Sequence, residues 1–381
     1  MSRKDIYLDY AAASPLDSRV LEAMSPYFSD LFYNPSANYL LARKVNQDIL
    51  KAREIVAGLL EVKPAEIYFT AGGTEANNLA IKGVMDKFSS KNVVISSIEH
   101  ESVVDPAKGY LHKIAPVDNQ GFIKLGRLSE LIDDDTVLIS IMYVNNEIGA
   151  IQPLRKISSL IKVVRSKRLE EGNQTPLYFH TDACQVANYE NIKVNGLGVD
   201  LMTLNGGKIY GPKQSGILYI HRSIKLNPQI LGGGQEFGLR SGTENVANII
   251  GFSKALEIAQ NLREIESKRL HELQQYFFDS LMKIYPKIHI NGPQKNRVAN
   301  NVNVSFVGFD NEELLFKLDN MGVMCSTGSA CNAKKNNISV SLLAIGLSKS
   351  EALSSLRFSL GRQTDLEQIK RTIEIIKKAL V

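Results

Sequence analysis

Three short stretches of this chain carry residue types that together could bind one cofactor. Lys208 lies on a glycine-rich turn (205–211, NGGKIYG), Asp182 ends a largely apolar run, and Gly73 and Thr74 follow another. A lysine can form a Schiff base, an aspartate can hold a pyridine nitrogen protonated, and a helix N-terminus can bind a phosphate. These are the needs of a pyridoxal phosphate (PLP) site. A lone lysine on a turn is usually a solvated charge, so the prediction depends on all three stretches.

The composition is that of a globular protein with room for one large and one smaller domain. The chain has 381 residues, 44% of them hydrophobic and 22% charged. Its three cysteines show no paired spacing, which argues against a disulfide scaffold or a structural zinc site, and we expect no metal. The net charge of +5 is scattered, so direct nucleic-acid binding is not expected. Without a signal-peptide pattern or a long apolar run, we expect a soluble, cytoplasmic protein with no membrane segment.

The elements that must position these residues alternate between strand and helix along the middle of the chain. Such alternation predicts a mostly parallel sheet covered by helices on both faces. Ligands of such sheets bind at the carboxyl ends of the strands, where the three stretches fall. The predicted strands are 67–70, 93–96, 137–144, 177–182, 201–204 and 217–221, and the predicted helices are 74–87, 102–113, 154–169 and 244–276.

The two ends of the chain are predicted to add further elements. The N-terminal part shows a short strand at 6–9, a helix capped by Asp17, and a long amphipathic helix at about 39–60. Beyond the Pro/Asn/Gly-containing stretch 285–296, the pattern indicates a small α+β unit with strands 302–307, 323–326 and 356–360 and helices 311–321 and 365–380. We assign residues 15–257 to a large PLP-binding domain, and residues 1–14 with 258–381 to a small domain that carries a polar, small-residue loop at 326–337. We expect that loop to be mobile and exposed.

Ten motifs in order resemble those of the group I cysteine desulfurases, within the class V aminotransferase-like PLP enzymes. The resemblance covers residues 7–376, nearly the whole chain, and implies an α/β fold, PLP-dependent transferase fold type I. The motifs are YLDYAAASP (7–15), NPSA (34–37), FTAGGTEANNLAIKG (69–83), SSIEH (96–100), MYVNNEIGAIQ (142–152), HTDACQ (180–185), NGGKIYGPK (205–213), GGGQEFGLRSGTENVA (232–247), TGSAC (327–331) and LRFSLGR (356–362).

The resemblance implies roles for the residues that would contact the cofactor ring. Lys208 would form the Schiff base, Asp182 would pair with the ring nitrogen, and Gln185 would bond the phenolic oxygen. His100 would stack on the ring and shuttle protons. Taken singly, each has a plainer interpretation: a solvated charge, a strand-end aspartate, a surface glutamine or a satisfied polar group.

Other implied roles concern the phosphate and the substrate. Gly73 and Thr74 would bind phosphate at the helix start, although Thr74 could equally be a helix cap. Asn146 and Arg357 would hold the substrate carboxylate, Arg357 by a bidentate fork. Thr243, in the segment 240–243, would complete the phosphate site of the partner subunit, which implies a homodimer.

Cys331 would be the nucleophile that accepts sulfur as a persulfide. Lys334 and Lys335 could favour its thiolate. Cys325 ends an apolar run and is interpreted as a packing residue. Cys184 is also interpreted as packing, although its place beside Asp182 leaves a reactive role open.

The chain departs from the family pattern at several positions. The family usually has a serine and a histidine, both on the cofactor phosphate, where this chain has Asn205 and Gly207. Asn205 can still donate through its amide. Phe237, Tyr33 and Tyr39 also replace usual family residues, and we expect the chain to lack the longer C-terminal tail by which relatives dock an iron–sulfur scaffold.

The sequence therefore predicts a cysteine desulfurase that converts L-cysteine, through a PLP aldimine, to L-alanine and a persulfide on Cys331. The sulfur would go to an acceptor protein for iron–sulfur clusters, for tRNA thiolation, or for both. Two alternatives remain open: another PLP lyase or aminotransferase, such as a selenocysteine lyase, and a degenerate scaffold homologue without turnover, which Gly207 favours.

Overall fold

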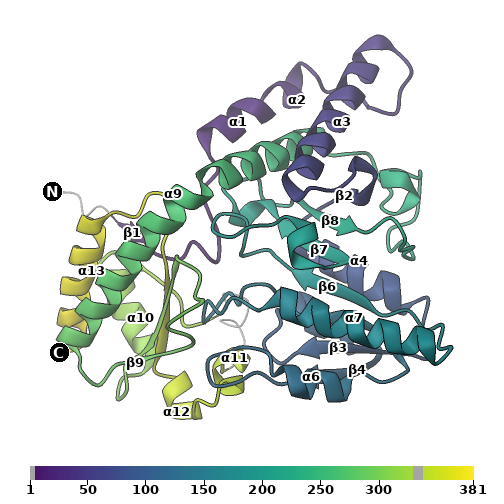
Figure 1. Ribbon diagram of the computed structural model, residues 1–381. Helices are drawn as coiled ribbons and strands as arrows, with labels where there is room; N and C mark the ends of the chain where they lie inside the picture. The colour runs from purple at the N-terminus through teal and green to yellow at the C-terminus, as the bar shows by residue number, and fades with distance from the viewer. Residues whose placement is uncertain (1–4, 329–337) are drawn as a thin grey trace.

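The computed structural model describes residues 5–328 and 338–381, and its largest element is a seven-stranded sheet (Figure 1). The pairs β7–β6, β6–β5, β5–β3 and β3–β4 are parallel, whereas β8 runs antiparallel to β2 and β7. This confirms the predicted mostly parallel sheet. In spatial order the strands are β2 (Ile67–Thr70), β8 (Gly216–Ile220), β7 (Leu201–Asn205), β6 (Tyr178–Asp182), β5 (Thr136–Ser140), β3 (Asn92–Ser96) and β4 (Leu111–Ala115).

Alternate side chains of these strands pack into two separate hydrophobic cores, one on each face of the sheet. In β7, Met202 and Leu204 belong to one core while Leu201 belongs to the other. The first core includes buried residues of α3 (Leu40–Leu60), α7 (Leu154–Glu170) and α9 (Val246–Ile284), and the second includes those of α4 (Gly73–Met85) and α5 (Glu101–Ala107). Burial on both faces explains why these strands read as continuous apolar runs.

The 39-residue helix α9 crosses the molecule from the large sheet to the C-terminal part (Figure 1). It packs against α1 (Ser18–Met24) and α3 near one end and against α13 (Leu366–Ala379) near the other. Asp17 caps α1 as predicted, accepting a hydrogen bond from the Arg19 backbone N–H at 3.0 Å. A short helix α2 (Pro26–Ser29) and the 3₁₀ turn η1 (Pro64–Glu66) complete this region. No helix within the described residues is long and apolar enough to cross a membrane.

The C-terminal part contains a three-stranded antiparallel sheet and a two-stranded parallel one. The first has the order β12 (Ser355–Ser359), β10 (Asn301–Ser305), β9 (His289–Ile290), and the second pairs β1 (Ile6–Tyr7) with β11 (Val323–Met324). Its helices are α10 (Asn311–Asn320), α11 (Val340–Ala344), α12 (Lys349–Ala352) and α13. We propose that residues 1–14 and 258–381 form the small domain. The pairing of β1 with β11 supports this division, and α9 runs through its boundary.

Several of the predicted elements were wrong in extent; the helix predicted over 244–276, for example, continues to Ile284 as α9. The helix predicted over 102–113 ends at Ala107, and an edge strand, β4, begins at Leu111. Pro106 and Gly109 disfavour further helix, and pairing with β3 then selects the extended form. The strand predicted over 137–144 ends at Ser140, because the chain then turns along the pocket described below. The sequence pattern did not predict the short helices α6 (Leu125–Leu131) and α8 (Val194–Leu197), nor β9, α11 and α12.

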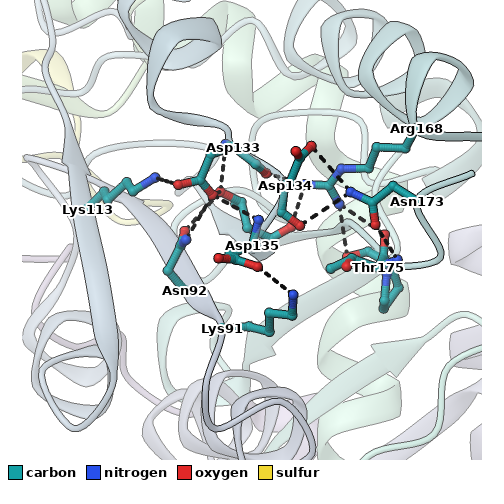
Figure 2. A network of polar contacts seen from close by, with 11 residues as sticks. Lys91, Asn92, Lys113, Asp133, Asp134, Asp135, Arg168, Asn173 and Thr175 are labelled. Carbon is teal, nitrogen blue, oxygen red and sulfur yellow. Dashed lines mark hydrogen bonds and ion pairs between the residues drawn. The ribbon is translucent and has the colours of Figure 1, made fainter. Parts of the chain in front are cut away.

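A polar network holds the amino ends of β3 and β5 (Figure 2). Asp133 accepts hydrogen bonds from Asn92 Nδ2 at 2.9 Å and Thr136 Oγ1 at 2.9 Å and pairs with Lys113. Although its partial burial opposes the effect, these donors lower the pKa of Asp133. Arg168 donates to the carbonyl of Thr136 at 2.8 Å. These contacts stabilise the amino ends of the strands, and the candidate site lies at the opposite, carboxyl ends.

Candidate active site

A pocket lies at the carboxyl ends of the strands of the large sheet. Strands β3, β6 and β7 run toward it, and β2 reaches the same edge because it is antiparallel to β8. The predicted site residues among its lining are Gly73, Thr74, His100, Asn146, Asp182, Gln185, Asn205, Lys208 and Arg357.

Asp182, the last residue of β6, is oriented by two donors. Its Oδ2 accepts from Asn77 Nδ2 at 2.6 Å and its Oδ1 accepts from the Cys184 backbone N–H at 2.9 Å. The neighbouring Glu99 is half-buried, but its carboxyl Oε2 is buried and contacts no donor among the described residues. Burial raises the pKa of Glu99 to about 8. At pH 7 the raised pKa favours the uncharged form of Glu99.

Lys208 lies in the 3₁₀ turn η2 (Gly206–Lys208), which Asn205 caps through a 3.0 Å hydrogen bond from the Gly207 N–H. The Lys208 Nζ donates to the carbonyls of Ala11 at 2.9 Å and Ala12 at 2.6 Å. Those carbonyls belong to the N-terminal YLDYAAASP motif, more than 190 residues away in the chain. The N-terminal segment therefore holds the amine in the wall of the pocket.

The start of α4 and the end of β7 together form a cradle for an anion. Gly72 has a left-handed φ of 117°, which lets the chain turn from β2 into α4 at Gly73. A Cβ on Gly73 would lie 2.7 Å from Cys184 Sγ and 3.5 Å from Asn205 Nδ2. Because Asn205 Oδ1 already accepts from Gly207, the amide Nδ2 is the group turned toward the start of α4. Backbone N–H groups and this amide can bind a phosphate.

Arg357, on β12, is almost fully buried yet lines the pocket. Its Nη2 lies 2.7 Å from Asp9 Oδ1 and its Nη1 donates to the Asn146 carbonyl at 3.0 Å. Its Nε, also buried, finds no acceptor among the described residues. Burial raises the pKa of Asp9, and the positive charge of Arg357 opposes that rise. The guanidinium therefore has donor capacity left for a substrate carboxylate.

His100 and Gln185 are each held by a hydrogen bond to a backbone group. His100 is the N-cap of α5, and its Nδ1 accepts from the Ser102 backbone N–H at 3.0 Å. Gln185 Nε2 donates at 3.0 Å to the Ala11 carbonyl, which is one of the two carbonyls that also hold Lys208. Both side chains line the pocket, which brings them to the same cofactor-sized space.

Thr243 is the predicted cofactor residue that does not line the Lys208 pocket. It lines a second cavity together with Arg240 and Glu236. Arg240 pairs with Glu75, in the first turn of α4, at 2.9 Å. The segment 240–243 therefore lies beside the helix that starts at Gly73, without reaching into the same chain's pocket.

The predicted nucleophile Cys331, with Lys334 and Lys335, lies outside the described residues. The chain on either side of that segment is anchored beside the substrate pair. Ser326 exchanges backbone hydrogen bonds with Arg357 at 3.0 and 2.7 Å. Ser339 donates through its hydroxyl to Glu147, the residue after Asn146. Burial raises the pKa of both Cys325 and Cys184, so neither thiol is activated.

The donor set fits PLP, since an amine, a carboxylate and a phosphate cradle face one cavity. Three residues of the site escaped the sequence analysis: Asp9, Asn77 and Ser102. Asp9 lies in the motif YLDYAAASP and Asn77 lies in FTAGGTEANNLAIKG. Their place in these motifs is the sequence feature from which a role in the site could have been predicted.

Comparisons with known proteins agree with this geometry. Residues 6–372 match the family model described as Aminotransferase class-V. The chain is 40% identical over 386 aligned residues to Cysteine desulfurase IscS of Dictyoglomus turgidum, covering 99% of this chain and 95% of that protein. A solved structure of a NifS-like protein has a TM-score of 0.90 at 32% identity and 99% coverage of both chains. A structure of SspA in complex with cysteine has a TM-score of 0.78 at 36% identity, covering 93% of this chain and 98% of that one.

Proposed function

Because the chain belongs to the class-V aminotransferase family and is one of its PLP-dependent cysteine desulfurases, we propose that it transfers sulfur from L-cysteine to Cys331. The observation that carries this proposal is the placement of Arg357. Its side chain lines the pocket with Lys208, and its backbone anchors Ser326, which leads toward Cys331. A carboxylate-binding group, an amine and the approach to a thiol thus meet at one place.

PLP, when bound at Lys208, would supply an electron sink next to the substrate α-carbon. Asp182 would hold a negative charge against the ring nitrogen, and Gln185 would donate to the phenolic oxygen. Gly73, Thr74 and Asn205 would bind the phosphate. The described contacts of each support these roles: two donors orient Asp182, and the Asn205 amide faces the start of α4.

Arg357 and Asn146 would fix the substrate carboxylate, which leaves the amino group and the side-chain sulfur toward Lys208 and His100. The Lys208 amine and the His100 Nε2 could each move a proton in the pocket. Cys331 would attack the substrate sulfur as a thiolate. The substrate C–S bond breaks as the S–S bond forms, the α-amino acid gains a proton at its former CH₂–S carbon, and L-alanine leaves with a Cys331 persulfide behind.

Alanine formation from L-cysteine, measured in three variants that each lack one cysteine, tests the assignment of Cys331 as the nucleophile. Cys331→Ala should stop turnover while the bound-cofactor spectrum stays, whereas Cys184→Ala and Cys325→Ala should mainly lower stability through small cavities. Lys208→Ala should abolish both turnover and the covalent cofactor band. Activity that survives Cys331→Ala but is lost in Cys184→Ala would show that Cys184, and not Cys331, is the nucleophile.

We also propose a homodimer, a cytoplasmic location and a sulfur-acceptor protein that serves iron–sulfur clusters or tRNA thiolation. The position of Thr243 outside the Lys208 pocket of its own chain supports the dimer. The absence of paired cysteine spacing supports a reducing compartment. Light scattering of the purified protein tests the first point, and transfer of ³⁵S from labelled cysteine to candidate acceptors tests the last.

A further inference from the structure

An unbroken chain of hydrogen bonds joins Asp182 to His100 through two side chains of different helices. Asn77 of α4 donates from Nδ2 to Asp182 Oδ2 at 2.6 Å and to Ser102 Oγ at 2.8 Å. Ser102 of α5 lies with its Oγ 2.8 Å from His100 Nδ1. The two residues expected to contact the cofactor ring are therefore linked behind the pocket wall.

The direction of each hydrogen bond in this chain is determined by chemistry. A backbone N–H is always a donor, so the Ser102 N–H, 3.0 Å from His100 Nδ1, makes that nitrogen an acceptor. In the neutral ring the proton then lies on Nε2. An ionised carboxylate only accepts, which commits one Asn77 N–H to Asp182 and the other to Ser102. The Ser102 hydroxyl accepts from Asn77, and its own proton shares the single lone pair of His100 Nδ1 with the Ser102 N–H as a bifurcated hydrogen bond.

The burial of the linking residues shows that their polarity is costly for the fold. Asn77 is 1% exposed and Ser102 is 8% exposed. Asn77 Oδ1 is buried and accepts no hydrogen bond from any described residue. An unsatisfied buried oxygen is unfavourable, so an apolar residue of the same shape would suit packing alone better. The two hydrogen bonds that Asn77 Nδ2 donates, to Asp182 and to Ser102, therefore explain why an asparagine occupies this position.

We propose that Asn77 and Ser102 are positioning residues, which orient Asp182 and hold His100 as the tautomer that presents Nε2–H to the pocket. The proposal rests on the proposed desulfurase function for its kinetic consequence only. Asn77 acts on both sides, whereas Ser102 acts on His100 alone. Neither residue contacts Arg357 or Asn146 in the hydrogen bonds of the described chain, so their effect falls on turnover rather than on substrate binding.

The kinetic test measures alanine formation from L-cysteine by the PLP-loaded enzyme. Ser102→Ala should lower kcat about tenfold, the value of one modest hydrogen bond, with KM unchanged. Ser102→Thr keeps the hydroxyl and should recover most of that loss. Ser97→Ala is the matched control, since Ser97 lies close to Ser102 in the sequence, in the connection between β3 and α5, and its Oγ has no partner among the described residues.

A double-mutant cycle shows whether the effect passes through His100. In a His100→Ala background, Ser102→Ala should change kcat less than twofold, because the group that it positions is gone. An equal loss in both backgrounds, or an equal loss in Ser97→Ala, overturns the role of Ser102.

The role of Asn77 is tested by the absorption spectrum and the retention of the bound cofactor rather than by turnover. Asn77→Leu keeps the branching of the side chain but removes the donor to Asp182, so it should shift the absorption band of the bound cofactor and speed PLP loss in dialysis. Ser102→Ala should leave both nearly unchanged. If the wild type binds PLP yet makes no alanine, the proposed function is wrong. The spectrum and PLP retention of Asn77→Leu still test the positioning role of Asn77 in that case. A wild-type spectrum and PLP retention in Asn77→Leu overturn the proposal.

Discussion

Asp9 Oδ1 lies 2.7 Å from Arg357 Nη2, which joins residues near the two ends of the chain beside the candidate substrate pocket that Arg357 lines. The side chains are 16% and 2% exposed, so this ion pair is largely removed from water. Arg357 therefore has two functions in one position. It balances a buried carboxylate and it offers its remaining donors to a substrate.

Arg357→Ala should damage both stability and substrate use. Loss of Arg357 leaves the half-buried Asp9 carboxylate without its cation, which should lower the unfolding free energy by roughly 1–3 kcal/mol. Asp9→Asn in the same chain should recover part of that loss, as measured by urea unfolding, but should not restore the KM for L-cysteine. Full recovery of KM in the double variant would show that Arg357 is structural only.

Asp9→Asn by itself should raise the KM for L-cysteine more than it lowers kcat. The neutral amide no longer holds Nη2 by charge, and the fork that receives the substrate carboxylate becomes less well oriented. Steady-state kinetics with L-cysteine measures this split. Asp5→Asn, a change at an exposed position of the same N-terminal segment, serves as the control.

The raised pKa of Glu99 makes stability depend on pH. Because the folded-state pKa of about 8 exceeds the ordinary value of 4.5, the folded state binds the proton more tightly. The contribution of Glu99 is complete below pH 4.5 and is lost as pH rises through 8, by at most about 1.4 kcal/mol per pH unit. Glu99→Gln should flatten the decline of the unfolding midpoint between pH 5 and pH 8, whereas Glu272→Gln on the exposed face of α9 should not.

Gly207→His should improve PLP retention. Gly207 does not adopt a left-handed backbone conformation, so a side chain is compatible with η2. Its Cβ would lie 3.2 Å from Lys213 Cδ, which must shift by a few tenths of an ångström along a flexible side chain. An imidazole donor to the phosphate should be worth roughly 1.5–3 kcal/mol, or about tenfold to a hundredfold in affinity. PLP release during dialysis measures the gain, with Gly58→His on α3 as a control in open space.

Mixed dimers should show whether Thr243 serves the partner's site. Lys208→Ala and Thr243→Ala chains should each be impaired alone. After they are unfolded together and refolded as a mixture, half the dimers carry one site with an intact Lys208 and a Thr243 from the other chain. Desulfurase activity should therefore reappear. If the mixture is no more active than the sum of its parts, Thr243 acts within its own chain or not at all.

Local sequence was sufficient for the chemistry-bearing positions that follow strands. The positions of Asp182 and Lys208 at strand ends could be predicted because an apolar run that stops at a glycine or a charged residue is visible within a few residues of sequence. The capping of α1 by Asp17 and the start of α4 at Gly73 are local for the same reason. The mostly parallel sheet with helices on both faces followed from the alternation of predicted strands and helices along the chain.

Tertiary structure decided which distant groups meet. The pairing of Asp9 with Arg357, the carbonyls of Ala11 and Ala12 on Lys208, and the Asn77–Ser102 contact each join different elements. No short window contains both partners of such a pair, because their approach depends on how the elements pack. The same reason explains β4, where pairing with β3 selected a strand in a segment whose local pattern also suited a helix.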